Sequence, residues 1–211
     1  MKLDLDRSAF IAIDVQNDFC PGGALAVKDG ADIIPLVNKL SAFFKYSIAT
    51  QDWHPQAHVS FASSHPGASA YSSIIINGQE NVVWPDHCVQ GSRGADFHPS
   101  LRMEPYRLVI RKGTNLALDS YSAFFENDGK TATGLDGYLK GLGINTVVLA
   151  GLAFDYCVFF SARDAARLGY KTLVVEDASK PVGSPPGSVE EAVKDMQSRA
   201  VAIIKSGDIL S

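Results

Sequence analysis

The sequence has few cysteines and no dense block of positive charge. Only 3 of the 211 residues are cysteine, an odd number without a Cys-x-x-Cys pair, so a reducing compartment is expected rather than a disulfide framework. The formal net charge is -4 and the Lys and Arg residues are scattered, which argues against nucleic acid or an anionic membrane as a partner. These absences favour a protein that acts on small molecules.

Long apolar runs are missing as well. No run reaches the length of about 20 residues that a bilayer-spanning helix needs. The first six residues are rich in charge and lead into an apolar stretch that is too short for the core of a secretory signal. We therefore expect a soluble, cytoplasmic protein without membrane contact.

The composition fits one domain. With 46% hydrophobic and 20% charged residues, the chain is long enough for one well-buried core and too short to need two. The sequence contains no internal repeat, linker or low-complexity segment, so residues 1–211 are expected to fold as a single domain.

Short apolar runs alternate with stretches of helical spacing. Strands are predicted over 8–13, 46–50, 107–110, 146–149, 171–175 and 200–204. Helices are predicted over 32–44, 135–142, the segment after Asp155, and 189–199. The stretch 59–105 shows little periodicity and is expected to be irregular. The alternation predicts an α/β fold in three layers, with a six-stranded parallel sheet covered by helices on both faces.

Four chemically active residues each follow the end of a different predicted strand. They are Asp14, Asp52, Lys112 and Cys157. Because ligands of parallel sheets collect at the carboxyl ends of the strands, we expect these residues to share one rim of the sheet.

Cys157 lies where the predicted strand has ended and helical spacing begins. Unpaired N–H groups and the helix dipole at such a position would favour the thiolate, which attacks carbonyl groups. Asp14 could act as its base, and Lys112 could supply positive charge to both. Each residue also has a simpler interpretation: an inert buried Cys, an Asp that caps a turn, and a Lys that points to solvent.

A second set of residues has the character of metal ligands. Asp52-x-His54-x-x-x-His58, followed later by His87, offers one carboxylate and up to three imidazoles. Such a set suits one divalent ion, either Zn, Fe(II) or Mn(II). The spacing of His54 and His58 can place both rings on one face of a helix. His65 and His98 are interpreted as ordinary surface histidines.

Six segments carry a resemblance to a known family. They are Asp14-Val-Gln-Asn-Asp-Phe-Cys-Pro-Gly-Gly-Ala-Leu25, Asp52-Trp-His-Pro55 with His58, Trp84-Pro-Asp-His-Cys-Val89, Arg111-Lys-Gly113, Asp119-Ser-Tyr-Ser-Ala-Phe124 and Gly151-Leu-Ala-Phe-Asp-Tyr-Cys-Val158. In this order they resemble the nicotinamidase/pyrazinamidase branch of the isochorismatase-like (cysteine hydrolase) superfamily, from about Phe10 to the last strand.

The resemblance implies a three-layer α/β/α amidohydrolase that converts nicotinamide to nicotinate and ammonia, in salvage of NAD. Activity on pyrazinamide and related aromatic amides is also implied. By motif position, Asp14, Lys112 and Cys157 correspond to the catalytic triad, and the reaction would pass through a thioester on the cysteine. Four residues correspond to the metal ligands: Asp52, His54, His58 and His87.

The resemblance also implies the walls of the substrate site. Phe19 and Trp84 would sandwich the ring, with Tyr121 as a further pocket residue. The backbone N–H groups of Ala153 and Cys157 would form the oxyanion hole, beside a cis peptide between Leu152 and Ala153. Phe154 stands where the family more often carries Thr, so the shape of the pocket is expected to differ there.

Other interpretations stay open at this point. Isochorismatases share the fold but commonly lack the cysteine, and carbamoyl-amine hydrolases keep the cysteine but not the metal set. A non-catalytic binding module or a thiol redox protein would be a different class, although no resolving Cys lies near Cys157 in the sequence. The native metal, the breadth of amide substrates and the number of subunits are left open, with a homo-oligomer as one option.

Overall fold

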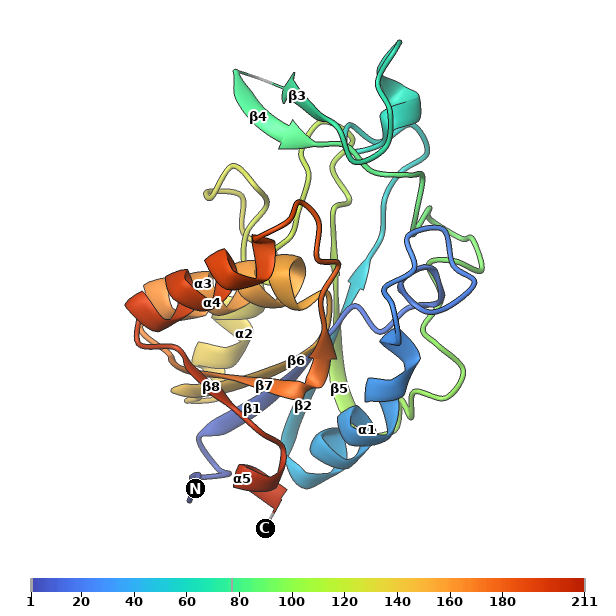
Figure 1. The fold of residues 1–211 in the computed structure, drawn as a ribbon. Helices are drawn as coiled ribbons and strands as arrows, with labels where there is room; N and C mark the ends of the chain where they lie inside the picture. Colours follow the sequence, from blue (N-terminus) through green and yellow to red (C-terminus); the bar gives the residue numbers. More distant parts are fainter. Residues whose placement is uncertain (1, 77, 211) are drawn as a thin grey trace.

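A six-stranded sheet forms the centre of the computed structural model, which describes residues 2–76 and 78–210 (Figure 1). Neighbouring strands all run parallel, in the order β5-β2-β1-β6-β7-β8. The strands are β1 (Ser8–Ile13), β2 (Tyr46–Asp52), β5 (Tyr106–Lys112), β6 (Thr146–Leu152), β7 (Lys171–Lys180) and β8 (Ala202–Ile204). The predicted parallel sheet is confirmed, although β7 continues to Lys180 instead of ending at Val175.

Helices cover both faces of this sheet (Figure 1). One face carries α1 (Ile34–Phe43) and α5 (Gly207–Leu210), and the other carries α2 (Leu135–Gly141), α3 (Phe159–Arg167) and α4 (Ser188–Ser198). Phe10 of β1 packs in one core with Val37 of α1, whereas Ile11 packs in the other with Leu139 of α2. Successive side chains of a strand point to opposite faces, so the two cores produce the expected three-layer α/β/α fold.

Shorter turns of helix complete the backbone. Three are 3₁₀ helices, at Asn17–Phe19, Gly30–Ile33 and Ala62–Ser64. The helix predicted after Asp155 begins as a short π-helix, Phe154–Val158, before α3. None of the helices in the described part of the chain combines the length and the apolar character that crossing a membrane requires.

The stretch expected to be irregular contains a hairpin. Strands β3 (Ser73–Ile76) and β4 (Gln79–Val82) pair antiparallel, at the top of the molecule in Figure 1. The sequence carried a signal for it, because an Asn-Gly pair after an apolar run is typical of a tight hairpin turn. That pair is Asn77-Gly78, of which Asn77 lies outside the described residues.

The carboxyl ends of four neighbouring strands carry the residues predicted to share one rim. Asp52 and Lys112 are the last residues of β2 and β5, and they pair in register. Asp14 directly follows β1, and Cys157 lies beyond the end of β6 in the π-helix. Because β1 lies between β2 and β6, the strand order reverses at this point, where parallel sheets bind their ligands.

The backbones of β1 and β6 approach each other closely at Gly151. It has a φ of 134°, and an added Cβ would lie 2.1 Å from the carbonyl oxygen of Ile13. Gly151→Ala is therefore expected to lower the free energy of unfolding by about 3 kcal/mol. Gly137→Ala is the control, since a Cβ there meets no described atom within 4 Å. In helix α2 it is expected to raise stability by about 0.5–1 kcal/mol. Denaturant unfolding measures both, and equal effects would contradict the close approach.

Candidate active site

The side chains of Asp14, Lys112 and Cys157 meet at the rim of the sheet. The Lys112 ammonium lies 2.9 Å from Oδ2 of Asp14 and 3.6 Å from Sγ of Cys157. Asp14 and Lys112 are 0% exposed and Cys157 is 6% exposed. Residues far apart in the sequence thus form a single buried group of a carboxylate, an ammonium and a thiol, as a cysteine nucleophile with a carboxylate base requires.

Asp14 is held through both of its carboxylate oxygens. The Thr50 hydroxyl on β2 donates to Oδ1 of Asp14 at 2.6 Å, and the Asp14 backbone N–H donates to the same hydroxyl at 3.1 Å. Oδ2 pairs with the Lys112 ammonium at 2.9 Å and, unlike Oδ1, receives no hydrogen bond from Thr50. The Asp14 carboxylate is also close enough to the Cys157 thiol to hydrogen-bond with it and to accept its proton.

Burial controls the protonation of this group. It raises the pKa of the Cys157 thiol well above its ordinary value, and the nearby Lys112 only partly opposes it. Burial likewise raises the pKa of the Asp14 carboxyl against the lowering effect of Lys112. The sequence-based expectation of a thiolate favoured by a helix end is therefore wrong, because the π-helix buries the sulfur. A resting thiol of this kind needs a base, and Asp14 is in place to act as one.

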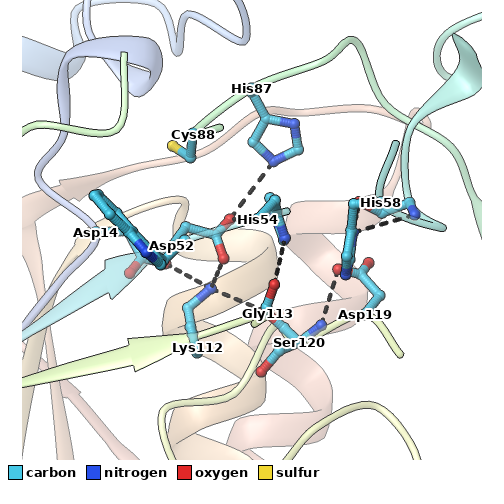
Figure 2. A network of polar contacts seen from close by, with 12 residues as sticks. Asp14, Asp52, His54, His58, His87, Cys88, Lys112, Gly113, Asp119 and Ser120 are labelled. Carbon is cyan, nitrogen blue, oxygen red and sulfur yellow. Dashed lines mark hydrogen bonds and ion pairs between the residues drawn. The ribbon is translucent and has the colours of Figure 1, made fainter. Parts of the chain in front are cut away.

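Two imidazoles converge on one carboxylate oxygen beside the triad. Nδ1 of His54 lies 3.0 Å from the Gly113 carbonyl oxygen, and Nδ1 of His87 lies 2.7 Å from that of Pro85. A carbonyl can only accept, so each Nδ1 carries the proton. The opposite nitrogens lie near Oδ2 of Asp52, which is 3.1 Å from Nε2 of His54 and 3.5 Å from Nε2 of His87. Figure 2 shows the His87 nitrogen turned toward Asp52.

This arrangement fits a metal ion. The ligand atoms of Asp52, His54 and His87 all lie within 4.8 Å of one another. Oδ1 of Asp52 accepts a hydrogen bond from Lys112 at 3.0 Å, which leaves Oδ2 for a cation. Burial raises the pKa of the Asp52 carboxyl, but the nearby Lys112 ammonium helps to hold it well below its usual range. A carboxylate oxygen and two ring nitrogens are a ligand set that Zn and Fe(II) accept.

The backbone around Asp52 and His54 fixes this geometry. The side-chain amide of Gln16 donates to the Asp52 carbonyl oxygen and its Oε1 accepts the Asp52 N–H, both at 2.8 Å. Gly113 has a φ of 63°, and a Cβ there would lie 2.4 Å from Cε1 of His54. Both residues fall inside the motifs identified in the sequence, but their supporting role depends on contacts that only the fold reveals.

His58 lies beside this group but faces other partners. Its ring stacks on His54 with the centroids 4.2 Å apart. Its Nδ1 lies 2.7 Å from the Ser60 hydroxyl, and its Nε2 lies 2.9 Å from the Asn115 carbonyl oxygen. It shares a second potential ligand group with His54 and Asp119, a residue that sequence reasoning missed. As a ligand of the ion at Asp52, His58 stays a prediction.

A cavity with aromatic walls opens beside the triad. It is lined by the three predicted substrate residues and by both predicted oxyanion residues, which are Phe19, Trp84, Tyr121, Ala153 and Cys157. Trp84 Nε1 donates to the Tyr121 hydroxyl at 3.0 Å, which fixes two of the walls relative to each other. The peptide between Leu152 and Ala153 is cis, as expected. Sequence reasoning missed four lining residues: Leu25, Asp119, Tyr156 and Val182.

Comparison with known proteins shows the family to which this chain belongs. A family model described as Isochorismatase domain matches residues 8–208. The chain belongs to the isochorismatase family. The nicotinamidase of Acinetobacter baylyi is 46% identical over 97% of this chain and 95% of that protein. The nicotinamidase of Escherichia coli is 41% identical over 95% of each chain.

Solved structures show the same isochorismatase-family fold. A nicotinamidase/pyrazinamidase of Acinetobacter baumanii superposes with a TM-score of 0.95 at 48% identity, covering 97% of this chain and 98% of the other. PnC1 of L. infantum in complex with nicotinate superposes with a TM-score of 0.86 at 36% identity, covering 98% of this chain and 96% of the other. The pyrazinamidase of Pyrococcus horikoshii in complex with zinc superposes with a TM-score of 0.77 at 35% identity, covering 94% of this chain and 99% of the other. The family predicted from the motifs is confirmed.

Phe154 was expected to reshape the pocket of this isochorismatase-family member. Its ring is 6% exposed and packs in the core that also holds Ile13 and Val158. It is not among the described residues that line the cavity. Phe154 therefore does not line the cavity directly, and its effect on the shape of the pocket stays a prediction.

Lys112 provides a test of the buried charge arrangement. Lys112→Met leaves Asp14 and Asp52 buried without their shared cation, so the free energy of unfolding of the metal-free protein is expected to fall by about 3–5 kcal/mol. Lys140→Met is the matched control, since its ion pair with Asp136 lies at the surface and surface pairs contribute little. Denaturant titration in the presence of a chelator measures both variants. Equal stability of the two would contradict a central role for the Lys112 ammonium.

Proposed function

We propose that this chain is an amidohydrolase that converts nicotinamide to nicotinate and ammonia, forming one isochorismatase-like domain over residues 1–211. The observation that carries the proposal is the buried contact of the Lys112 ammonium with both Cys157 and Asp14, at the wall of a cavity with aromatic sides. The relatives named nicotinamidase support it. The product would enter salvage of NAD.

Acylation begins with a proton transfer. The Asp14 carboxylate takes the thiol proton while the sulfur of Cys157 attacks the carboxamide carbon. The backbone N–H groups of Ala153 and Cys157, both at the cavity wall, hold the resulting oxyanion. Asp14 then gives its proton to the departing amine, so ammonia leaves and a thioester remains on Cys157.

Deacylation reverses these roles. Asp14, now a carboxylate, takes a proton from a water molecule that attacks the thioester carbon. The sulfur leaves and recovers the proton, and nicotinate is released. Through both halves the Lys112 ammonium stays beside Asp14 and Cys157 and stabilises whichever of them is negative.

We propose Asp52, His54, His58 and His87 as the protein ligands of one divalent ion, Zn, Fe(II) or Mn(II); Asp52, His54 and His87 already lie together as a potential ligand group. The zinc complex of the Pyrococcus horikoshii pyrazinamidase supports zinc as one occupant. When bound, the ion would supply a Lewis acid for the ring nitrogen of the substrate. The ring of His58 stacks on that of His54 with the centroids 4.2 Å apart, and the two share a potential ligand group, which supports its place in this set.

The walls of the cavity set the proposed substrate class. Phe19 and Trp84, both almost fully buried, present aromatic surfaces to the cavity. Flat rings stack on such surfaces with little dependence on the identity of the ring atoms. We therefore extend the proposal to pyrazinamide and related aromatic amides.

The nucleophile is tested by removing its sulfur. Cys157→Ala is expected to lower the kcat for ammonia release from nicotinamide by about 10³-fold or more, because no thioester can form. Its metal content is expected to match that of the wild type. Cys20→Ala is the control, a buried free cysteine outside the described cavity lining, and is expected to retain turnover.

Retained turnover in Cys157→Ala would overturn the assignment of the nucleophile. A wild-type protein that binds metal and nicotinamide but releases no ammonia would instead favour a non-catalytic binding module.

The metal site is tested at a residue that is not a ligand. Gly113→Ala forces a methyl group against the His54 ring, so the affinity for zinc is expected to fall about 10–100-fold. Gly143→Ala is the control, because its φ of 71° gives similar backbone strain without any described atom within 4 Å of the new Cβ. Competition with a chromogenic chelator measures both affinities. An equal loss in the two variants would show that His54 does not hold the ion.

A further inference from the structure

One wall of the cavity comes from the loop between β7 and α4. This loop, residues 181–187, reads Pro-Val-Gly-Ser-Pro-Pro-Gly, and its Val182 lines the cavity together with Cys157. Three of its seven residues are proline and lack a backbone N–H, so the loop has few groups with which to fix its own shape. Its position depends on contacts with its neighbours.

The segment that carries the nucleophile supplies those contacts. The buried carboxylate of Asp155 accepts the N–H of Val182 at 2.8 Å, the N–H of Gly183 at 2.9 Å and the Ser188 hydroxyl at 2.6 Å. The Tyr156 hydroxyl donates to the Ser184 carbonyl oxygen at 2.6 Å. The two residues directly before Cys157 therefore hold the loop near its beginning, at its middle and at the start of α4.

We propose that Asp155 is a positioning residue that holds Val182 as a specificity wall, so that the cavity admits flat monocyclic aromatic carboxamides and rejects those with a substituent on the side of Val182. This role of Asp155 rests on the proposed function, which concerns the chemistry at Cys157. It adds the residues that limit which amides enter the cavity. Asp155 does not line the cavity among the described residues and acts through Val182.

The hydrogen bonds explain why a carboxylate occupies this position. Bonds to an ionised acceptor are stronger than neutral ones, and a single carboxylate can accept all three donors at once. An amide in its place has one acceptor oxygen and one NH₂ group, which would face a donor. Asp155→Asn is therefore expected to release part of the loop while the size of the side chain is retained.

The wall also includes Tyr156, which lines the cavity and packs edge-on against Trp84 with ring centroids 4.9 Å apart. Because its hydroxyl holds the loop at Ser184, the aromatic wall and the loop are fixed to the same π-helix as the nucleophile. Movement of the loop would change the width of the cavity at the reacting sulfur.

The test compares nicotinamide with a panel of ring-methylated nicotinamides. Val182→Ala is expected to raise kcat/KM for at least one methylated amide relative to nicotinamide by about tenfold, the usual effect of one methyl group in an apolar pocket. Asp155→Asn is expected to shift the same ratio in the same direction and to raise the KM for nicotinamide more than it lowers kcat. Glu190→Gln, exposed in the first turn of α4, is the control and is expected to leave the ratio unchanged.

The double variant separates positioning from a general loss of structure. If Asp155 acts through Val182, Asp155→Asn combined with Val182→Ala shifts the ratio no further than Val182→Ala alone, because the wall is already gone. Should Asp155→Asn fail to fold, Ser188→Ala removes one of the three hydrogen bonds and is expected to shift the ratio in the same direction by a smaller factor.

Several outcomes would overturn the inference. If the ratio of kcat/KM for the methylated amide to that for nicotinamide is unchanged in Val182→Ala, Val182 forms no wall. If the same ratio is unchanged in Asp155→Asn while thermal stability falls, the Asp155 carboxylate has only a structural role. A wild-type protein that hydrolyses no amide refutes the proposed function instead. In that case the ratio of dissociation constants for nicotinamide and its methylated analogues, measured by calorimetry in the same variants, decides the role of the wall.

Discussion

The ammonium of Lys112 is the group on which the site depends. It lies without solvent exposure between the carboxylates of Asp14 and Asp52, and it also contacts the sulfur of Cys157 and the carbonyl oxygen of Ser120. Two buried carboxylates this close together would repel each other and would lose their hydration, at a cost that only a shared cation offsets. The same ammonium therefore joins the nucleophile group to the metal-ligand group and allows both to exist in the interior. Figure 2 shows Lys112 beside Asp14 and Asp52.

The parallel sheet makes this convergence possible. Strands β5, β2, β1 and β6 are neighbours, so residues that end them lie within reach of one another although the sequence separates them widely. The register of β2 with β5 places Asp52 directly beside Lys112, and Thr50 on β2 reaches across to Asp14 after β1. The chemistry at the rim follows from strand order and pairing, while the two apolar cores on either side hold the strands in place.

Much of this could be predicted from the sequence, because apolar β-branched runs and the polar residues at their ends are local features. The sheet, its layers and the meeting of Asp14, Lys112 and Cys157 belong to that part. The inward direction of Phe154, the partners of His58 and the raised pKa of the Cys157 thiol could not be predicted, because they depend on which groups surround each side chain. Val182 was missed for a related reason, because it lies in a loop without periodicity that only tertiary contacts bring to the cavity. Asp119 begins one of the quoted motifs, but its place at the cavity likewise depends on tertiary contacts.

The main chain determines more of the metal-ligand group than its side chains suggest. The carbonyl oxygens of Gly113 and Pro85 orient His54 and His87, and the side chain of Gln16 holds Asp52 through its peptide groups. Such oxygens belong to the main chain, so their place depends on the local backbone path, which at Gly113 leaves no room for a side chain. The two rings are consequently held with their lone pairs toward Asp52, so an ion bound by this group would require little rearrangement of these side chains.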